Sequence, residues 1–116
     1  MTESENIVNF DDWAKLDLRV AKILKVEDIE GADKLYKLEI DVGKELGKRT
    51  ICAGLKPYYE KAKLKGRKII YFSNLAPRKM KGIESQGMLL AASTEDHEKV
   101  SLLQPDADIE VGSIVG

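Results

Sequence analysis

The stretch Leu35-Tyr36-Lys37-Leu38-Glu39-Ile40-Asp41-Val42 alternates apolar and charged side chains more cleanly than any other part of the chain. Successive side chains of a β-strand point to opposite faces, so an alternation of period two separates a buried face from a solvent face. The apolar side chains at positions 36, 38, 40 and 42 would then line a core. This stretch predicts a half-buried strand, and the rest of the fold is worked out from it.

Further strands are expected on both sides of this one. The residues from Leu18 to Glu27 read as a preceding strand, with a bulge or bend where Lys22 and Ile23 break the alternation. Strands are also expected at 49–53, 68–74 and 88–93. A short helix is expected at 55–64, with Tyr58, Tyr59, Ala62 and Leu64 available for the core, and a polar, basic loop at 75–87.

A helix between the third and fourth of five antiparallel strands is the connectivity of the OB fold. The predicted class is therefore all-β with short helices, a five-stranded OB barrel with a C-terminal extension. The extension would contain short extended pieces at 100–103 and 109–111. Periodicity alone leaves an SH3-like or other small barrel open as the alternative.

The chain is expected to divide into a polar, flexible N-terminal segment at 1–9 and a single domain at 10–116. A short helical turn is expected from Phe10 to Leu16, capped by Asn9 or Asp11. Phe10 and Trp13 would share one face of this turn and pack against the domain.

The composition excludes several classes of protein. The chain has 116 residues, 34% of them charged, with one cysteine and a formal net charge of −1. Its apolar runs are far shorter than the ~20 residues of a membrane span, so no membrane association is expected. A single cysteine suits a reducing compartment, and the acidic N-terminus does not resemble a signal peptide. The expected location is the cytoplasm.

The near-neutral total conceals a segregation of charge along the chain. Residues 1–43 carry six Lys/Arg against eleven Asp/Glu, residues 44–81 carry twelve against two, and residues 82–116 carry one against seven. A basic block between two acidic ends indicates one basic face, although solvated lysines on a helix and loops would give the same count.

Catalytic chemistry has little support in the sequence. His97 is the only histidine and lies in a polar stretch without a second ligand at metal-binding spacing. Cys52 lies within a predicted strand and fits a small packed residue. The stretch 43–49 differs from a phosphate-binding loop in its glycine spacing and in Arg49, which replaces the Ser/Thr that holds magnesium. We predict a protein that is not an enzyme, with no catalytic residue, cofactor or metal.

The strongest binding signal is the predicted loop at 75–87. Arg78, Lys79 and Lys81 place three cations in four residues, beside the amide of Asn74. These cations suit phosphates, and the planar guanidinium of an arginine can also stack on a base. Asn74, Ser85 and Gln86 would either recognise polar groups of a ligand or hold the loop in shape.

In an OB barrel two loops frame the binding groove, and the second of them lies between the first two strands. It contributes Lys34 as a phosphate contact and Tyr36 as a ring on which a base could stack. Tyr36 could equally be a core residue, and Met88 either a ligand contact or a barrel plug.

Several strings resemble the successive motifs of the tRNA-binding domain family, over about residues 10–116. They are Asp17-Leu18-Arg19-Val20, Ala32-Asp33-Lys34-Leu35-Tyr36, the 49–55 strand with its Ala-Gly-Leu end, Asn74-Leu75-Ala76-Pro77-Arg78-Lys79 and Gly82-Ile83-Glu84-Ser85-Gln86-Gly87-Met88. This family forms the C-terminal module of methionyl-tRNA synthetases and also occurs as free-standing proteins. The resemblance implies an OB fold with a C-terminal extension, a homodimer, and tRNA bound by shape rather than by anticodon.

The resemblance leaves two questions of function open. The protein would act alone or as a separately encoded, beta-subunit-like partner of an aminoacyl-tRNA synthetase. Secretion-associated chaperones of the same fold, which bind unfolded protein clients, are the alternative. The intact Ser-Gln-Gly-Met string at 85–88 favours tRNA binding over that alternative.

Overall fold

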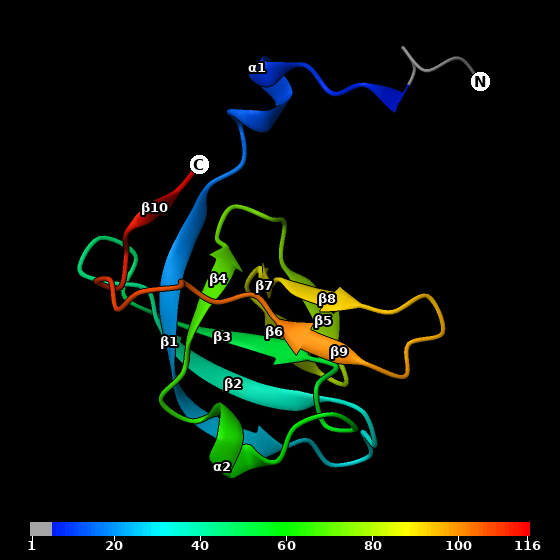
Figure 1. Cartoon of the computed structure of the whole chain (residues 1–116). Helices are drawn as coiled ribbons and strands as arrows, with labels where there is room; N and C mark the ends of the chain where they lie inside the picture. Colours follow the sequence, from blue (N-terminus) through cyan, green and yellow to red (C-terminus); the bar gives the residue numbers. More distant parts are fainter. Residues whose placement is uncertain (1–5) are drawn as a thin grey trace.

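Five antiparallel strands curl into a nearly closed barrel in the computed structural model, which describes residues 6–116 (Figure 1). The strands are β1 (Leu18–Asp28), β2 (Tyr36–Asp41), β3 (Lys48–Ala53), β4 (Lys68–Phe72) and β7 (Met88–Leu89). They are hydrogen-bonded in the order β3-β2-β1-β4-β7, and α2 (Lys61–Leu64) lies between β3 and β4 in the chain. This order confirms the predicted OB fold.

The first strand holds the barrel together because it pairs with three others. β1 is eleven residues long and pairs with β4 through its first half and with β2 through its second half. The register with β2 shifts between Ile23 and Lys25, which confirms the predicted irregularity. The bend at this shift lets one strand serve both sides of the barrel.

The barrel interior is filled by the apolar faces that the alternation predicts. Tyr36, Leu38, Ile40 and Val42 are all buried, and Leu64 of α2 is fully buried with them. The expected core helix is much shorter than predicted, because residues 56–58 form a turn and helical geometry begins only at Lys61. Tyr58 and Ala62 are exposed, so the prediction that they belong to the core is wrong.

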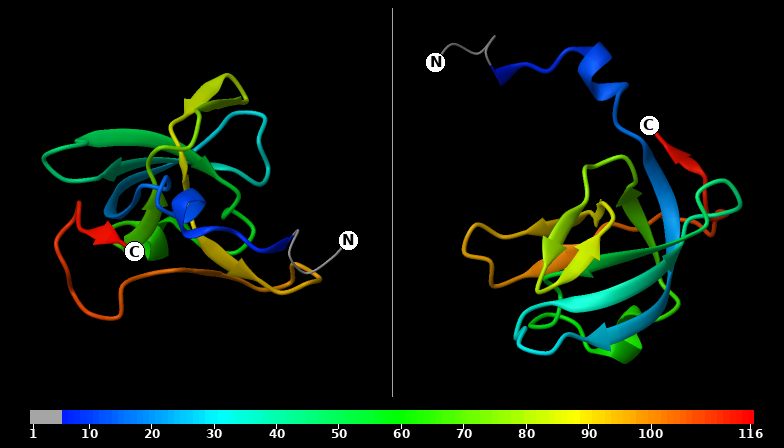
Figure 2. Two further views of the ribbon diagram at one scale, coloured as in Figure 1. Left: turned by 90° about the horizontal axis from the view of Figure 1, so that it is seen from above. Right: turned by 180° about the vertical axis from the view of Figure 1, so that it is seen from behind.

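The segment predicted as a basic loop at 75–87 contains a β-hairpin, β5 (Arg78–Met80) and β6 (Ile83–Ser85). Lys81 and Gly82 connect the two strands with φ angles of 53° and 81°. Positive φ at both central residues belongs to the tight turn whose twist matches that of paired strands. The hairpin stands out from the barrel in the view from above, on the left of Figure 2.

The predicted strand at 88–93 is divided between two sheets. β7 ends at Leu89, and β8 (Ala91–Ser93) pairs with β9 (Val100–Leu102) to form a second hairpin. In the C-terminal extension the strand is β10 (Ile114–Val115), which pairs with the start of β1, and the extended piece predicted at 109–111 is not a strand.

The N-terminal helix α1 (Phe10–Trp13) does not pack on the barrel, contrary to the sequence-based expectation. Phe10 is 76% exposed and Trp13 is 41% exposed, and α1 stands clear of the barrel (Figure 1). Asn9 precedes the helix without a side-chain capping bond. Of the segment predicted as flexible at 1–9, residues 1–5 lie outside the described residues, and residues 6–9 are exposed.

Candidate nucleic-acid interface

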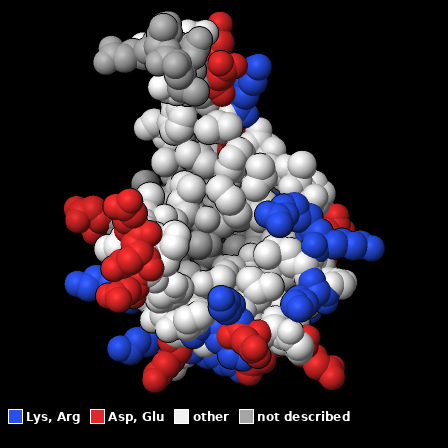
Figure 3. Space-filling model, turned by 90° about the vertical axis from the view of Figure 1, so that its right-hand side faces the viewer, with Lys and Arg blue, Asp and Glu red and all other residues white. Residues whose placement is uncertain are grey.

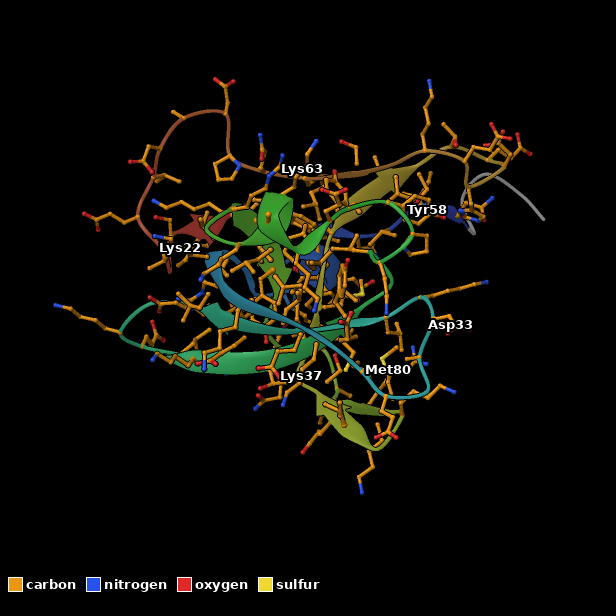
Figure 4. All side chains as sticks on the ribbon, turned by 90° about the horizontal axis from the view of Figure 1, so that it is seen from below. Lys22, Asp33, Lys37, Tyr58, Lys63 and Met80 are labelled. Atoms are coloured by element: carbon orange, nitrogen blue, oxygen red, sulfur yellow. The ribbon has the colours of Figure 1, made fainter. Side chains whose placement is uncertain are left out.

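A small apolar cluster fixes the basic hairpin to the loop between β1 and β2. Ile29, Ala32 and Cys52 form its buried centre, and Met80 and Ile83 of the hairpin pack against it. Figure 4 shows Met80 beside the loop that carries Asp33. The two loops that frame the binding groove of an OB barrel are thereby joined into one platform.

All four predicted phosphate-binding cations are exposed on this platform. They are Lys34, Arg78, Lys79 and Lys81. Within residues 6–116, none of these four side chains lies within 4.0 Å of a carboxylate, whereas Lys56 and Lys61 are both engaged by Asp28. Exposed cations without carboxylate partners are free to neutralise phosphates.

Arg78 and Lys79 lie on opposite faces of the β5–β6 hairpin. Arg78 lies opposite the buried Ser85, on the face that turns toward the barrel, while Lys79 lies opposite Glu84 on the other face. Side chains on successive strand residues point to opposite sides, so these neighbours in the chain meet different surroundings. Only Arg78 of the two lines the cavity described below.

The side chain of Asn74 joins two segments that are far apart in the sequence. Its Oδ1 accepts a hydrogen bond of 2.8 Å from the backbone N–H of Asp17, and its Nδ2 donates one of 2.6 Å to the carbonyl oxygen of Lys15. Both ends of the amide are therefore occupied within the protein. Asn74 holds the end of β4 to the chain entering β1, and these bonds support the structural one of the two roles that the sequence leaves open for it.

Ser85 and Gln86 close the barrel. The buried Ser85 hydroxyl accepts a 2.9 Å hydrogen bond from the N–H of Cys52. Gln86 and Thr50 bond in both directions, with the Gln86 N–H donating to the Thr50 carbonyl at 2.8 Å and the Gln86 Oε1 accepting from the Thr50 N–H at 2.9 Å. These bonds occupy the edge of β3. Of the two roles left open by the sequence, the hydrogen bonds support that of holding the loop in shape.

The sequence leaves Tyr36 and Met88 as either core residues or ligand contacts, and the structure buries the first and exposes the second. Tyr36 is 5% exposed, and its hydroxyl donates to the carbonyl oxygen of Tyr59 at 2.8 Å. Its ring therefore has no free face for a base, and its assignment as a stacking residue is corrected to the core. Met88 is 41% exposed and lines the cavity below.

A cavity of about 400 Å³ opens where the basic hairpin meets the end of β3 and the β8–β9 hairpin. Arg78, Met80 and Met88 contribute to one part of its lining, and Tyr58 and Val100 to another. Tyr58 is 37% exposed. The helical spacing of apolar residues around Tyr58 predicts a core position, which the exposed ring contradicts. Its position after β3, beside the groove of an OB barrel, was the signal for a surface role.

The Asp17-Leu18-Arg19-Val20 string acts inside the fold. Arg19 is 8% exposed, and its Nε and Nη2 donate to the two carboxylate oxygens of Asp17 at 2.6 and 3.2 Å. Its Nη1 donates to Glu45 at 3.2 Å. The hydrogen bond from Arg19, more than any other influence, lowers the pKa of Asp17 below its ordinary value. The motif links β1 to the β2–β3 loop and leaves no free guanidinium for a ligand.

The structure also shows the surroundings of Cys52 and of the side chains that could hold a metal ion. Burial raises the pKa of the Cys52 thiol, which keeps it protonated near neutral pH and weakens it as a nucleophile. In residues 6–116, no group of three or more His, Cys, Asp or Glu side chains is placed to hold a metal ion. The helices within that range are also too short or too polar to cross a membrane.

Comparison with known proteins identifies relatives of this chain. The family model described as "Putative tRNA binding domain" matches residues 18–114. A methionine–tRNA ligase of Pyrococcus horikoshii is 52% identical over 108 residues, which are 93% of this chain and 14% of the ligase. The chain thus corresponds to about one seventh of the length of that relative.

Solved structures of similar size share the fold. A methionyl-tRNA-synthetase-related protein from Pyrococcus horikoshii has a TM-score of 0.87 and 38% identity, covering 95% of this chain and 98% of that one. A CsaA chaperone from Picrophilus torridus has a TM-score of 0.85 and 33% identity, covering 95% and 100%. With the barrel, the joined loops and a match over nearly the whole chain in agreement, the protein belongs to the tRNA-binding domain family.

Proposed function

We propose that the protein binds tRNA without catalysing a reaction, through the basic platform formed by the β5–β6 hairpin and the β1–β2 loop. The observation that carries the proposal is a set of four exposed cations on two loops that an apolar cluster fixes to each other, and no carboxylate among residues 6–116 pairs with these cations. A rigid array of cations suits a folded RNA, whose phosphates are themselves held at set positions.

The platform favours recognition of shape over recognition of sequence. Lysine and arginine contacts to phosphates position a nucleic acid but do not identify its bases. Asn74, Ser85 and Gln86, which have side chains able to read base edges, make hydrogen bonds within the protein instead. Selection of tRNA over other RNA then depends on how its folded backbone matches the platform, not on the anticodon.

A salt titration of tRNA binding tests this proposal. If each of the four cations neutralises one phosphate, the logarithm of the association constant falls with the logarithm of salt at a slope of about −3, from ~0.7 per contact. Unfractionated tRNA is compared with an RNA duplex of unrelated sequence, and tRNA is expected to bind more tightly. Binding that does not change between about 50 and about 300 mM salt would remove the basic platform from the site.

The cellular role that follows is delivery of tRNA to an aminoacyl-tRNA synthetase. The relatives named above include methionine–tRNA ligases, in which the matching region is a small fraction of the whole. The module would act as a beta-subunit-like partner of such an enzyme or as a free-standing factor, in the cytoplasm. It would raise the concentration of tRNA near the synthetase active site and supply no catalytic group.

We also propose that the protein acts as a homodimer. Large apolar side chains are exposed on the N-terminal segment and on β10, namely Ile7, Val8, Phe10, Trp13, Leu16 and Ile114. Figure 1 shows α1 and the C-terminal strand at the same end of the molecule. Large apolar side chains exposed at one end of a molecule are typical of an interface, and a second copy presents the same surface in return.

A chaperone function is the second candidate, because the CsaA chaperone structure is 33% identical over nearly the whole chain. The cavity between the hairpins has apolar walls that would suit side chains of an unfolded client. A chemically unfolded protein added to the tRNA titration separates the two functions. Tight, salt-insensitive binding of the client with weak binding of tRNA would favour the chaperone.

A further inference from the structure

The cavity beside the basic hairpin has a composition that differs from that of a closed core. Met80, Met88 and Tyr58 provide apolar surface, while the side chains of Arg78, Ser93 and His97 add polar groups. No acidic residue contributes to its lining within the described residues. Its volume of about 400 Å³ lies in the range of small-molecule sites, which combine apolar walls with a few polar groups.

Charge is distributed unevenly across the two rims of this cavity. Arg78 belongs to the rim formed by the β5–β6 hairpin. The opposite rim is formed by the β8–β9 hairpin, whose connecting loop carries Glu95, Asp96 and Glu98 against the single cation Lys99. Figure 3 shows Lys and Arg side chains gathered on one side of a neutral, hollowed strip and Asp and Glu side chains on the other. A polyanion is attracted to the first rim and repelled from the second.

The side chain of Tyr58 is held at the cavity by a hydrogen bond to the loop of the β8–β9 hairpin. Its hydroxyl donates a 2.9 Å hydrogen bond to the carbonyl oxygen of His97. The side chain is therefore ordered before any ligand binds, and 37% of its surface is exposed. An immobilised, accessible ring is the surface on which an unstacked base binds in single-stranded nucleic-acid recognition.

We propose that this cavity binds one unpaired nucleobase of the tRNA, which stacks on Tyr58 while its phosphate contacts Arg78. The inference rests on the proposed tRNA-binding function and adds a site for a single base to it. Paired bases are stacked within a helix, so the cavity selects RNA that has an accessible unpaired nucleotide. The acidic loop on the far rim keeps the RNA backbone on the side of the hairpin.

A base fits the cavity better than an apolar side chain of a peptide does. Within residues 6–116, the hydroxyl of Ser93 and the imidazole of His97 make no hydrogen bond to other protein groups, so both can bond to the edge of a base. The guanidinium of Arg78 suits a phosphate, which a peptide backbone lacks. Binding of an unfolded protein in the cavity, in place of a base, is therefore the competing outcome of the experiment.

Two neighbouring alanines of β8 provide a matched pair of variants. Ala91 and Ala92 are both exposed, but only Ala91 lines the cavity, since successive strand residues face opposite sides. Ala91→Phe would fill the cavity, and Ala92→Phe adds the same bulk on the other face. Tyr58→Leu removes the ring, while Tyr58→Phe keeps it and loses only the hydroxyl.

Affinities of all four variants are measured for unfractionated tRNA, a blunt RNA duplex and an unfolded protein, with thermal melting to establish that each variant is folded. Ala91→Phe and Tyr58→Leu are expected to weaken tRNA binding about tenfold to a hundredfold, the range for loss of one base stack. Their affinity for the duplex and their salt dependence stay unchanged. Ala92→Phe remains within about twofold of wild type, and Tyr58→Phe, which keeps the ring but loses the bond that holds it, binds tRNA more tightly than Tyr58→Leu.

The outcomes separate this site from the tRNA-binding function as a whole. If the wild type binds tRNA and Lys34→Ala, outside the cavity, weakens it, but folded Ala91→Phe and Tyr58→Leu bind tRNA like their controls, the base site is overturned and the function stands. Loss of client binding alone in these two variants assigns the cavity to peptides and also overturns it. A wild type that binds no tRNA overturns both.

Discussion

Arg78 and Lys79 are adjacent in the chain, but we do not expect them to contribute equally to the proposed tRNA binding. Arg78 borders the cavity, whereas Lys79 lies on the opposite face of the hairpin across from Glu84. A nearby carboxylate reduces the attraction of a lysine for phosphate. We expect Arg78→Ala to weaken tRNA binding severalfold more than Lys79→Ala does, with each reducing the salt slope by less than about one unit. Titrations at several salt concentrations measure both quantities, and a larger effect of Lys79→Ala would contradict the assignment of faces.

We expect the carboxyl of Asp17 to make the stability of the fold depend on pH. Its hydrogen bond from Arg19 lowers the pKa of its carboxyl in the folded state. A depressed folded pKa contributes stability above the unfolded pKa, and this contribution is lost as pH falls through the folded value.

The free energy of unfolding should therefore differ between wild type and Asp17→Asn by a constant amount near neutral pH. The difference should shrink as pH falls below 3.8, the ordinary pKa of the carboxyl. Urea denaturation at a series of pH values measures it. A difference that stays the same down to the lowest pH would show that the charge of Asp17 contributes nothing.

At the scale of elements, the approach of β7 to β4 requires a glycine. Gly87 has a φ of 86°, and a Cβ at this position would lie 2.3 Å from the carbonyl oxygen of Phe72 and 3.0 Å from the ring of Tyr71. The hydroxyl of Tyr71 also donates to the carbonyl oxygen of Gln86. The turn from β6 into β7 is thus packed against β4 without room for a side chain.

Gly87→Ala is expected to destabilise the protein far more than Gly82→Ala. Gly82 also has a positive φ, of 81°, but an added Cβ there meets no atom within 4 Å. Its replacement costs only the backbone strain of an L-residue, about 1–2 kcal/mol. Gly87→Ala adds a steric overlap with backbone, so β7 must move and the barrel opens. Thermal unfolding of the two variants makes the comparison, and equal losses of stability would contradict it.

At the scale of the whole molecule, the exposed apolar end accounts for the proposed homodimer. Light scattering should give a mass about twice the 13.0 kDa of one chain. Phe10→Asp should produce a folded monomer, because the 76% exposure of Phe10 means that the barrel does not need it. Ile109→Asp is the control, since Ile109 is also exposed but lies in the C-terminal extension before β10. A wild type of 13.0 kDa at micromolar concentration would contradict the proposal.

The proposed homodimer would affect how tRNA is bound. Two copies of the basic platform on one particle could contact one tRNA at two places or hold two tRNA molecules. The monomeric Phe10→Asp variant separates these arrangements, because its platform is intact. Weaker binding by this variant at equal platform concentration would indicate that both copies contact one tRNA.

The sequence by itself determined the barrel. Alternation from Leu35 to Val42 reports which face of a strand is buried, because side-chain direction in a strand follows from the local backbone geometry. The order of the strands along the chain, and the presence of a helix before the fourth strand, can likewise be predicted from the sequence. The exposed cations at 78, 79 and 81 could be predicted as well, since clustered charges stay in water.

Only the tertiary structure decided what the uncharged residues of the site do. Tyr36 and Tyr58 are the same residue type, and one is buried while the other borders the cavity, because the packing around each comes from distant parts of the chain. Asn74, Ser85 and Gln86 bond to backbone groups 36 to 59 residues away or across the barrel seam at Cys52. A polar side chain binds whichever partner the fold brings within hydrogen-bond distance, and that distance is set by the closure of the barrel rather than by neighbouring residues.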